Sequence, residues 1–352
     1  MGSQQGRRLK WKKLGLAISG FLLFILALGL MKEGAGDLAP LLRGHLEITN
    51  VADSMGLGWL MAYLVLSGSP VAAAAVALLS AAALSPLQAF TMIAGSRLGA
   101  SLIVLLVGFV YALRGHDHWT ALTAGVLSLL LAGSVQLVAL PMGLLILSRG
   151  WLDNLAIPAL EGLAAGVNLG LEPLIAPFAA ILPGWALFAT GVGMVTLSFR
   201  LFDRALPQMR LERTGFSQLP RLVYRPEVMF LMGLVITLLT MSVSISVGIL
   251  VPLSARGYMR RENIIPYILG ANISTLADTL VAAALLGDPR AVTVVMTHMV
   301  CAAFVSLVPI LLAYRPYERA ISDALAWITR RRRNFALFLG VILVIPVVLI
   351  LL

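Results

Sequence analysis

Charged residues are scarce in this sequence. Asp, Glu, Lys and Arg make up 12% of the 352 residues, whereas hydrophobic residues make up 60%. A soluble globular domain could not bury so much apolar surface, so that class of protein is excluded. Several apolar runs reach the roughly 20 residues that a helix needs to cross a hydrocarbon layer ~30 Å thick. The short alternating segments of a membrane β-barrel are missing. The composition therefore predicts an all-α polytopic membrane protein.

Cysteine is almost absent as well. Cys301 is the only one, which excludes an intramolecular disulfide. The sequence also lacks a nucleotide-binding loop, a nucleophile triad and the residue spacing of a zinc site. We therefore expect no enzyme, no cofactor, and no metal other than sodium.

Acidic residues are outnumbered by basic ones, 16 to 26, and the formal net charge is +10. The basic residues lie in the gaps between apolar runs, where the positive-inside bias places them, so nucleic acid is not an expected partner. Residues 1–13 form a basic N-terminus ahead of an apolar run, 14–31, that is too long for a secretion signal. We expect a retained first helix, a cytoplasmic N-terminus and a multi-pass protein of the plasma (cell inner) membrane.

Apolar runs and charged loops divide the chain into two predicted transmembrane units. The first covers 14–150 and includes a helical hairpin at 54–84. A Pro-rich connection follows at 151–183, of which 154–182 could either span the membrane or lie at its surface. The second unit covers 184–313, with a cytoplasmic loop at 200–227 and a hairpin at 228–254, and after it come a basic cytoplasmic linker at 314–333 and a C-terminal helix at 334–352.

An internal repeat relates the two units. An ungapped offset of 175 residues aligns two glycines and two serines of one unit with the same residue types in the other. The first hairpin is entered from a net acidic loop and the second from an Arg-rich loop, so the positive-inside bias orients the two copies oppositely. We therefore expect inverted-topology repeats with re-entrant hairpins. The aligned pairs are Gly58 with Gly233, Ser67 with Ser242, Ser69 with Ser244, and Gly95 with Gly270.

Serine clusters occupy matching positions in the two hairpins. The stretch LSGSPV places Gly and Pro beside Ser67 and Ser69, and MSVSISVG places Ser242, Ser244 and Ser246 at alternate positions. Irregular backbone survives at membrane depth only against protein or a water-filled cavity. Such a bend can present N–H groups to an anion and oxygen atoms to a cation such as sodium. Helix packing is the alternative explanation, because small residues let membrane helices approach closely.

The second serine cluster is followed by the stretch GANISTLADT, which begins at Gly270. With these motifs, over about residues 15–320, the chain resembles the type II sodium–phosphate cotransporter family. That family has two inverted repeats, each with a Gln-Ser-Ser-Ser hairpin motif and a Gly-Ala-Asn-Ile-Gly-Thr-Thr motif. The resemblance implies a sodium-coupled symporter of inorganic phosphate or a similar small oxyanion that works by alternating access in the lipid bilayer. By resemblance, the residues that bind substrate and ions are Ser67, Ser69, Ser242, Ser244, Ser246, Asn272, Ser274 and Thr275.

The chain also departs from the pattern of that family. Leu66 and Met241 stand where the glutamines would be, and the first copy of the second motif reads GSRLGAS. Arg97 therefore occupies the position that matches Asn272. A transporter of a different anion remains an alternative for this reason. The sequence does not indicate the sodium stoichiometry or the oligomeric state.

Arg97 and Asp278 are charges within predicted membrane helices. An arginine there costs at least ~2.5–3.5 kcal/mol on insertion scales and normally faces the bundle interior with a partner. Arg97 could grip an oxyanion or fill the place of a sodium ion, and Asp278 could bind sodium or a proton. If Arg97 instead forms a structural pair with Asp278, Glu161 or Glu172, the chain could be a non-transporting membrane protein.

Gln136 and His298 each stand alone in an apolar stretch. Buried polar side chains in such helices usually hydrogen-bond to a neighbouring group. We therefore expect packing roles for both residues and do not assign them to the site.

Overall fold

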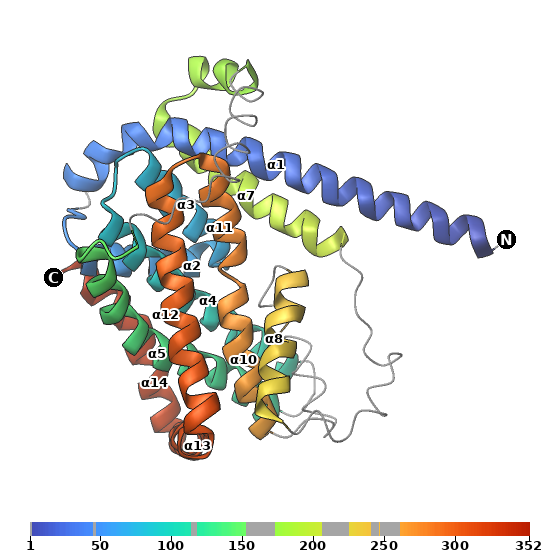
Figure 1. Ribbon diagram of the computed structural model, residues 1–352, viewed down its shortest axis with the longest axis vertical. Coiled ribbons are helices and arrows are strands. Elements are labelled where there is room, and N and C mark those ends of the chain that lie inside the picture. Colours follow the sequence, from blue (N-terminus) through green and yellow to red (C-terminus); the bar gives the residue numbers. More distant parts are fainter. Residues whose placement is uncertain are drawn as a thin grey trace.

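The protein is a bundle of helices (Figure 1). The computed structural model describes residues 2–44, 47–113, 118–152, 173–205, 225–240, 246 and 261–352. Within these residues there is no β-strand, and seven helices are long and apolar enough to span a membrane. In chain order the helices are α1 (Gly2–Gly44), α2 (Val51–Val65), α3 (Ser69–Ser80), α4 (Pro86–Leu113), α5 (His118–Ser148), α7 (Gly184–Ala205), α8 (Pro226–Thr240), α10 (Arg261–Ser274), α11 (Ala277–Leu286), α12 (Pro289–Leu312), α13 (Tyr314–Arg330) and α14 (Arg332–Ile350).

Two segments are more helical than we expected. Helix α1 continues past the predicted range 14–31 to Gly44, because its apolar face continues and buries Ala35 and Leu42 in the core. The expected linker 314–333 contains α13. One face of α13 carries Ile321, Leu325 and Ile328, which are buried and lie three or four positions apart, so they form a single apolar stripe.

Parts of the predicted organisation lie outside the described residues. Of the loop at 200–227, residues 206–224 lie outside, and of the hairpin at 228–254 only α8 and Ser246 are described. In the Pro-rich segment, residues 173–181 are helical and 153–172 lie outside.

The chain bends sharply between α2 and α3. Helix α2 ends at Leu66, whose φ of 52° lies in the left-handed region and cannot continue a helix. Helix α3 then starts at Ser69, with Pro70 in its first turn, where the missing N–H of proline is tolerated. The bend therefore falls within the stretch LSGSPV.

Helix α3 runs back along α2. Helices α2 and α4 are parallel, because Met55 contacts Gly95 and Ala62 contacts Gly99, so the contact advances in the same direction along both helices. The helix that joins them must then run in the opposite direction. Gly68, at the bend, packs against the middle of α4. The bend is thereby held beside the centre of that long helix.

Helices α8 and α10 cross in the same way as α2 and α4. A methyl group on Gly58 would overlap the carbonyl oxygen of Met92, and one on Gly233 would overlap that of Tyr267. The residue numbers of the second crossing are 175 higher than those of the first. Helix α8 also begins and ends 175 positions after α2. The reciprocal contacts are Gly95 with Met55 and Gly270 with Phe230.

Helices α1 and α7 lie side by side across one end of the bundle (Figure 1). Gly20 faces Ser198 and Gly34 faces Gly184, so the two helices are antiparallel. The Ser198 hydroxyl donates a hydrogen bond to the carbonyl oxygen of Gly20 over 2.7 Å, and this contact requires close approach of the two backbones.

The crossings of α2 with α4 and of α8 with α10, which we call the glycine crossings, yield a first prediction. Gly95→Ala and Gly270→Ala should each lower the melting temperature of the protein in detergent, because the added methyl group would overlap backbone atoms. Overpacking of this kind typically costs about 1–3 kcal/mol. Gly193→Ala is the matched control, since nothing lies within 4 Å of a methyl group at that position. Unchanged melting temperatures for both crossing variants would contradict the close backbone contacts.

Candidate functional site

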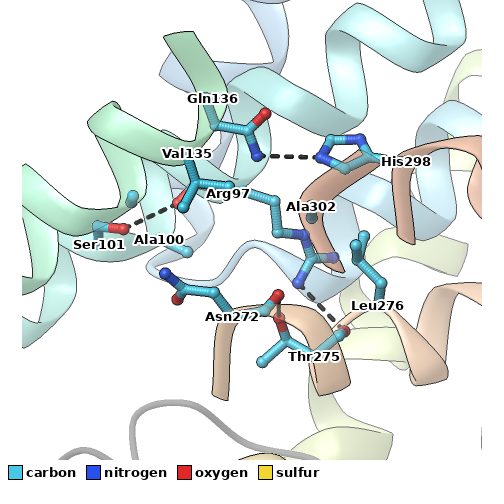
Figure 2. Close-up of a pocket in the computed structure, with 11 residues that line it drawn as sticks. Arg97, Ala100, Ser101, Val135, Gln136, Asn272, Thr275, Leu276, His298 and Ala302 are labelled. Carbon is cyan, nitrogen blue, oxygen red and sulfur yellow. Dashed lines mark hydrogen bonds between the residues drawn. The ribbon is translucent and has the colours of Figure 1, made fainter. Parts of the chain in front are cut away.

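A cavity of about 30 Å³ lies between helices α4, α5, α10 and α12 (Figure 2). Polar side chains from all four helices line it: Arg97 from α4, Gln136 from α5, Asn272 from α10 and His298 from α12. A volume of this size holds about two water molecules or a small ion. Arg97 and Asn272, which the offset of 175 residues aligns, therefore share one cavity.

The path of α10 is broken beside this cavity, whereas α4 is continuous. Thr275 and Leu276 separate α10 from α11. The Ser274 hydroxyl donates to the carbonyl oxygen of Ala271 over 3.2 Å, and the Thr275 hydroxyl donates to that of Asn272 over 2.9 Å. The Ala271 carbonyl also accepts from the Thr275 N–H, whereas the Leu276 N–H bonds to Ile273, so it is the Thr275 hydroxyl that satisfies the Asn272 carbonyl at the C-terminal end of α10.

Arg97 reaches from α4 to this break. Its Nη1 donates to the carbonyl oxygen of Thr275 over 3.2 Å, and its Nη2 donates to the Thr279 hydroxyl over 3.0 Å. That hydroxyl in turn donates to Oδ1 of Asp278 over 2.9 Å. No nitrogen of Arg97 lies within 4.0 Å of a carboxylate oxygen of Asp278, so these two described residues do not form a direct ion pair. Thr279 therefore connects the two charges.

Several buried atoms around the cavity have no hydrogen-bond partner among the described residues. They are Arg97 Nε, Asn272 Nδ2, His298 Nδ1 and Gln136 Oε1. Nε2 of Gln136 lies 3.0 Å from Nε2 of His298. An amide nitrogen can only donate, so the imidazole accepts at Nε2 and carries its proton on Nδ1.

The unsatisfied groups determine which guest the cavity favours. Three of them are donors and one is an acceptor. A buried donor or acceptor without a partner costs about 1–3 kcal/mol. A guest rich in acceptor oxygens would satisfy the donors, and the permanent charge of Arg97 would attract an anion.

The serines of the first hairpin lie near the cavity and not on its wall. Ser67 and Ser69 are partly exposed at the bend. The Ser69 hydroxyl faces the carboxyl group of Asp278, which is 4% exposed and whose Oδ2 has no hydrogen-bond partner among the described residues. The bend, the helix break and the acidic side chain are thus brought together.

The serines of the second hairpin are described only in part. Ser242 and Ser244 lie outside the described residues. Ser246 is buried and hydrogen-bonds to Thr237 of α8 and Tyr267 of α10. The structure therefore places Ser246 in the contact between two helices and not on the cavity wall.

Gln136 and His298 were missed as cavity residues by the sequence analysis. Each was expected to hydrogen-bond to a buried neighbour; they bond to each other, and both also line the cavity. The available signal was an isolated polar residue in each of two apolar helices. Because 162 positions separate them, no spacing rule could show that they meet.

These features indicate an all-α multi-pass membrane protein with a small cavity, lined in part by polar side chains, among its central helices. Comparisons with protein-family models, with curated proteins and with solved structures find no match. The resemblance to sodium–phosphate cotransporters therefore depends on the sequence motifs alone.

The connection between Arg97 and Asp278 yields a second prediction. Thr279→Val keeps the shape of the side chain but can neither accept from Arg97 nor donate to Asp278. Because it removes the hydrogen-bond partner of Arg97 Nη2 and of Asp278 Oδ1, we expect a loss of about 1–3 kcal/mol, measured as a lower melting temperature in detergent. Thr297→Val is the control, since the Thr297 hydroxyl is also buried and donates to the Thr293 carbonyl of its own helix. Equal losses in the two variants would show that the connection contributes no stability.

Proposed function

We propose that the protein is a secondary transporter that carries inorganic phosphate or a similar small oxyanion across the plasma membrane together with sodium. The observation that carries this proposal is the cavity beside Arg97, where unsatisfied donors outnumber acceptors. A charged residue inside a membrane bundle typically marks a substrate or ion pathway. The motif resemblance to sodium–phosphate cotransporters favours the same class.

Alternating access in this proposal relies on two inverted-topology repeats, each with a re-entrant hairpin. The matching glycine crossings of α2 with α4 and of α8 with α10 support such repeats. The antiparallel pair of α1 and α7 supports their opposite orientation. A pseudo-two-fold axis would then pass close to the cavity, since the aligned residues Arg97 and Asn272 both line it. Rocking of one repeat against the other would open that site to either side.

The irregular backbone around the cavity provides oxygen atoms for sodium. Ser67 and Ser69 lie at the bend of the first hairpin, between α2 and the start of α3. Hydroxyl and carbonyl oxygens are typical ligands of sodium in discontinuous membrane helices. Each net positive charge that moves inward releases about 2.3 kcal/mol per 100 mV of membrane potential, which would drive uptake.

Transport itself is tested in proteoliposomes. We expect phosphate uptake that requires a sodium gradient, and a competition panel of sulfate, arsenate and carboxylates would identify a different anion. Asn272→Leu removes a free donor from the cavity at similar volume and should weaken anion binding about 10-fold or more, because a hydrogen bond to a charged group contributes about 1.5–3 kcal/mol. Ser128→Ala is the control: its buried hydroxyl has no partner among the described residues and does not line the cavity.

The inverted topology is tested by labelling in cells. In a Cys301→Ala background, Ala82→Cys after the first hairpin should react with an impermeant maleimide from outside, and Arg225→Cys before α8 only after permeabilisation. Both positions are exposed, and the natural Cys301 is buried. Labelling of both sites from one side would contradict oppositely oriented repeats.

A non-transporting membrane protein is the second candidate. It is favoured by the fact that both terminal nitrogens of Arg97 already donate to protein oxygens. In that case no anion of the panel would be taken up, and none would raise the melting temperature. The role of Arg97 would then be structural only.

A further inference from the structure

We propose that the guanidinium group of Arg97 is a built-in cation, which occupies a cation-binding site at the α10–α11 break in place of a free sodium ion. This site consists of the Thr275 carbonyl, the Thr279 hydroxyl and the Asp278 carboxylate. The first two accept hydrogen bonds from Arg97 over 3.2 and 3.0 Å. The third is connected to it through Thr279.

The chemistry of these groups is that of a site for a hard cation. Carbonyl, hydroxyl and carboxylate oxygens are the ligands that such ions prefer. The Thr275 carbonyl also lies at the C-terminal end of α10, where the helix dipole contributes partial negative charge. Among the described residues, the groups that accept hydrogen bonds from the two terminal nitrogens of Arg97 are thus oxygen atoms, which can also bind an alkali ion.

The carboxylate of Asp278 could be contacted more closely by a cation than it is by Arg97. Asp278 is 4% exposed, and its Oδ2 has no hydrogen-bond partner among the described residues. Arg97 is anchored on α4 and reaches the carboxylate only through Thr279. A free ion without that anchor could bind Oδ2 directly. This unpartnered oxygen, together with the Ser69 hydroxyl that faces the same carboxyl group, offers oxygen ligands that a free cation could use.

The two halves of the chain contribute opposite charges to this arrangement. The broken path of α10 and α11 supplies the oxygens, and the unbroken helix α4 supplies the cation. Asn272, which the offset of 175 aligns with Arg97, is neutral. Arg97 of the first half can therefore fill the cation site in the second half, whereas the neutral Asn272 could not fill an equivalent site in the first half.

The consequence for coupling relies on the proposed transport function. If the protein is a sodium-coupled transporter, a tethered charge at this site removes one mobile sodium ion from the cycle. Each cycle would then move one positive charge fewer across the membrane. The existence of the cation site does not depend on transport.

The test is a cation titration of the purified full-length Arg97→Ala variant in detergent. Its melting temperature should fall below that of the wild type and then rise with sodium chloride, but not with choline chloride at equal ionic strength. Guanidinium chloride at low millimolar concentration should restore stability as well, because it returns the missing group. The same additions should raise the melting temperature of the wild type less, and this difference distinguishes the site of Arg97 from any other sodium site.

Two further variants identify the site. Leu98→Ala removes a buried neighbour of Arg97 on α4 and should lose stability without recovering in sodium or guanidinium. Adding Asp278→Asn to Arg97→Ala should abolish the recovery. A sodium response of Arg97→Ala no larger than that of the wild type, together with no guanidinium rescue, would overturn the proposal.

A further pair covers the case in which Arg97→Ala does not fold. Arg97→Lys retains a cation and should keep its stability without sodium, whereas Arg97→Met, of similar length, should depend on sodium. An equal sodium response in both would also overturn the proposal. Failure of phosphate uptake in proteoliposomes would leave these results unaffected, so the two proposals fail separately.

Discussion

The need to satisfy a permanent charge in a low-dielectric interior governs the central part of this protein. A guanidinium group cannot lose its proton, so Arg97 must be surrounded by acceptors wherever α4 places it. The structure supplies them by interrupting a helix: the break after α10 places the Thr275 carbonyl at the guanidinium, and Thr279 relays the contact to Asp278. The break, the acidic residue and the arginine therefore form one hydrogen-bonded unit.

Glycine crossings hold this unit in position. At the contacts of α2 with α4 and of α8 with α10, the backbones approach so closely that a methyl group would overlap a carbonyl oxygen. Membrane helices cannot rely on the hydrophobic effect to associate, because lipid is as apolar as their side chains, so close van der Waals contact has to replace it. These crossings position the bend after Leu66 beside the centre of α4 and α10 against α8. The cavity forms where the long helices of both halves meet.

The location of the polar residues in helices α4, α5, α10 and α12 could be predicted from the sequence only in part. Arg97, Asn272 and Thr275 were predicted from a charge inside an apolar run and from a motif, and all three line the cavity. Gln136 and His298 were assigned to packing, because an isolated polar residue in an apolar helix usually bonds to a neighbour. They do bond to each other, but their shared location on the cavity wall depends on how α5 and α12 meet. The Ser246 hydroxyl bonds instead to Thr237 of α8 and Tyr267 of α10, at the contact of these two helices.

The sequence alone determined the helical, membrane-spanning character of the chain, because the length and hydropathy of a segment decide whether it can cross a bilayer regardless of its neighbours. It also determined the offset of 175 residues, since a repeat is a property of the order of residues. Only the tertiary structure decided which polar groups meet. Helices α4 and α5 of the first half of the chain and α10 and α12 of the second contribute to one cavity of about 30 Å³. Whether a buried donor finds a partner there depends on where and how closely the helices cross, which no local sequence pattern specifies.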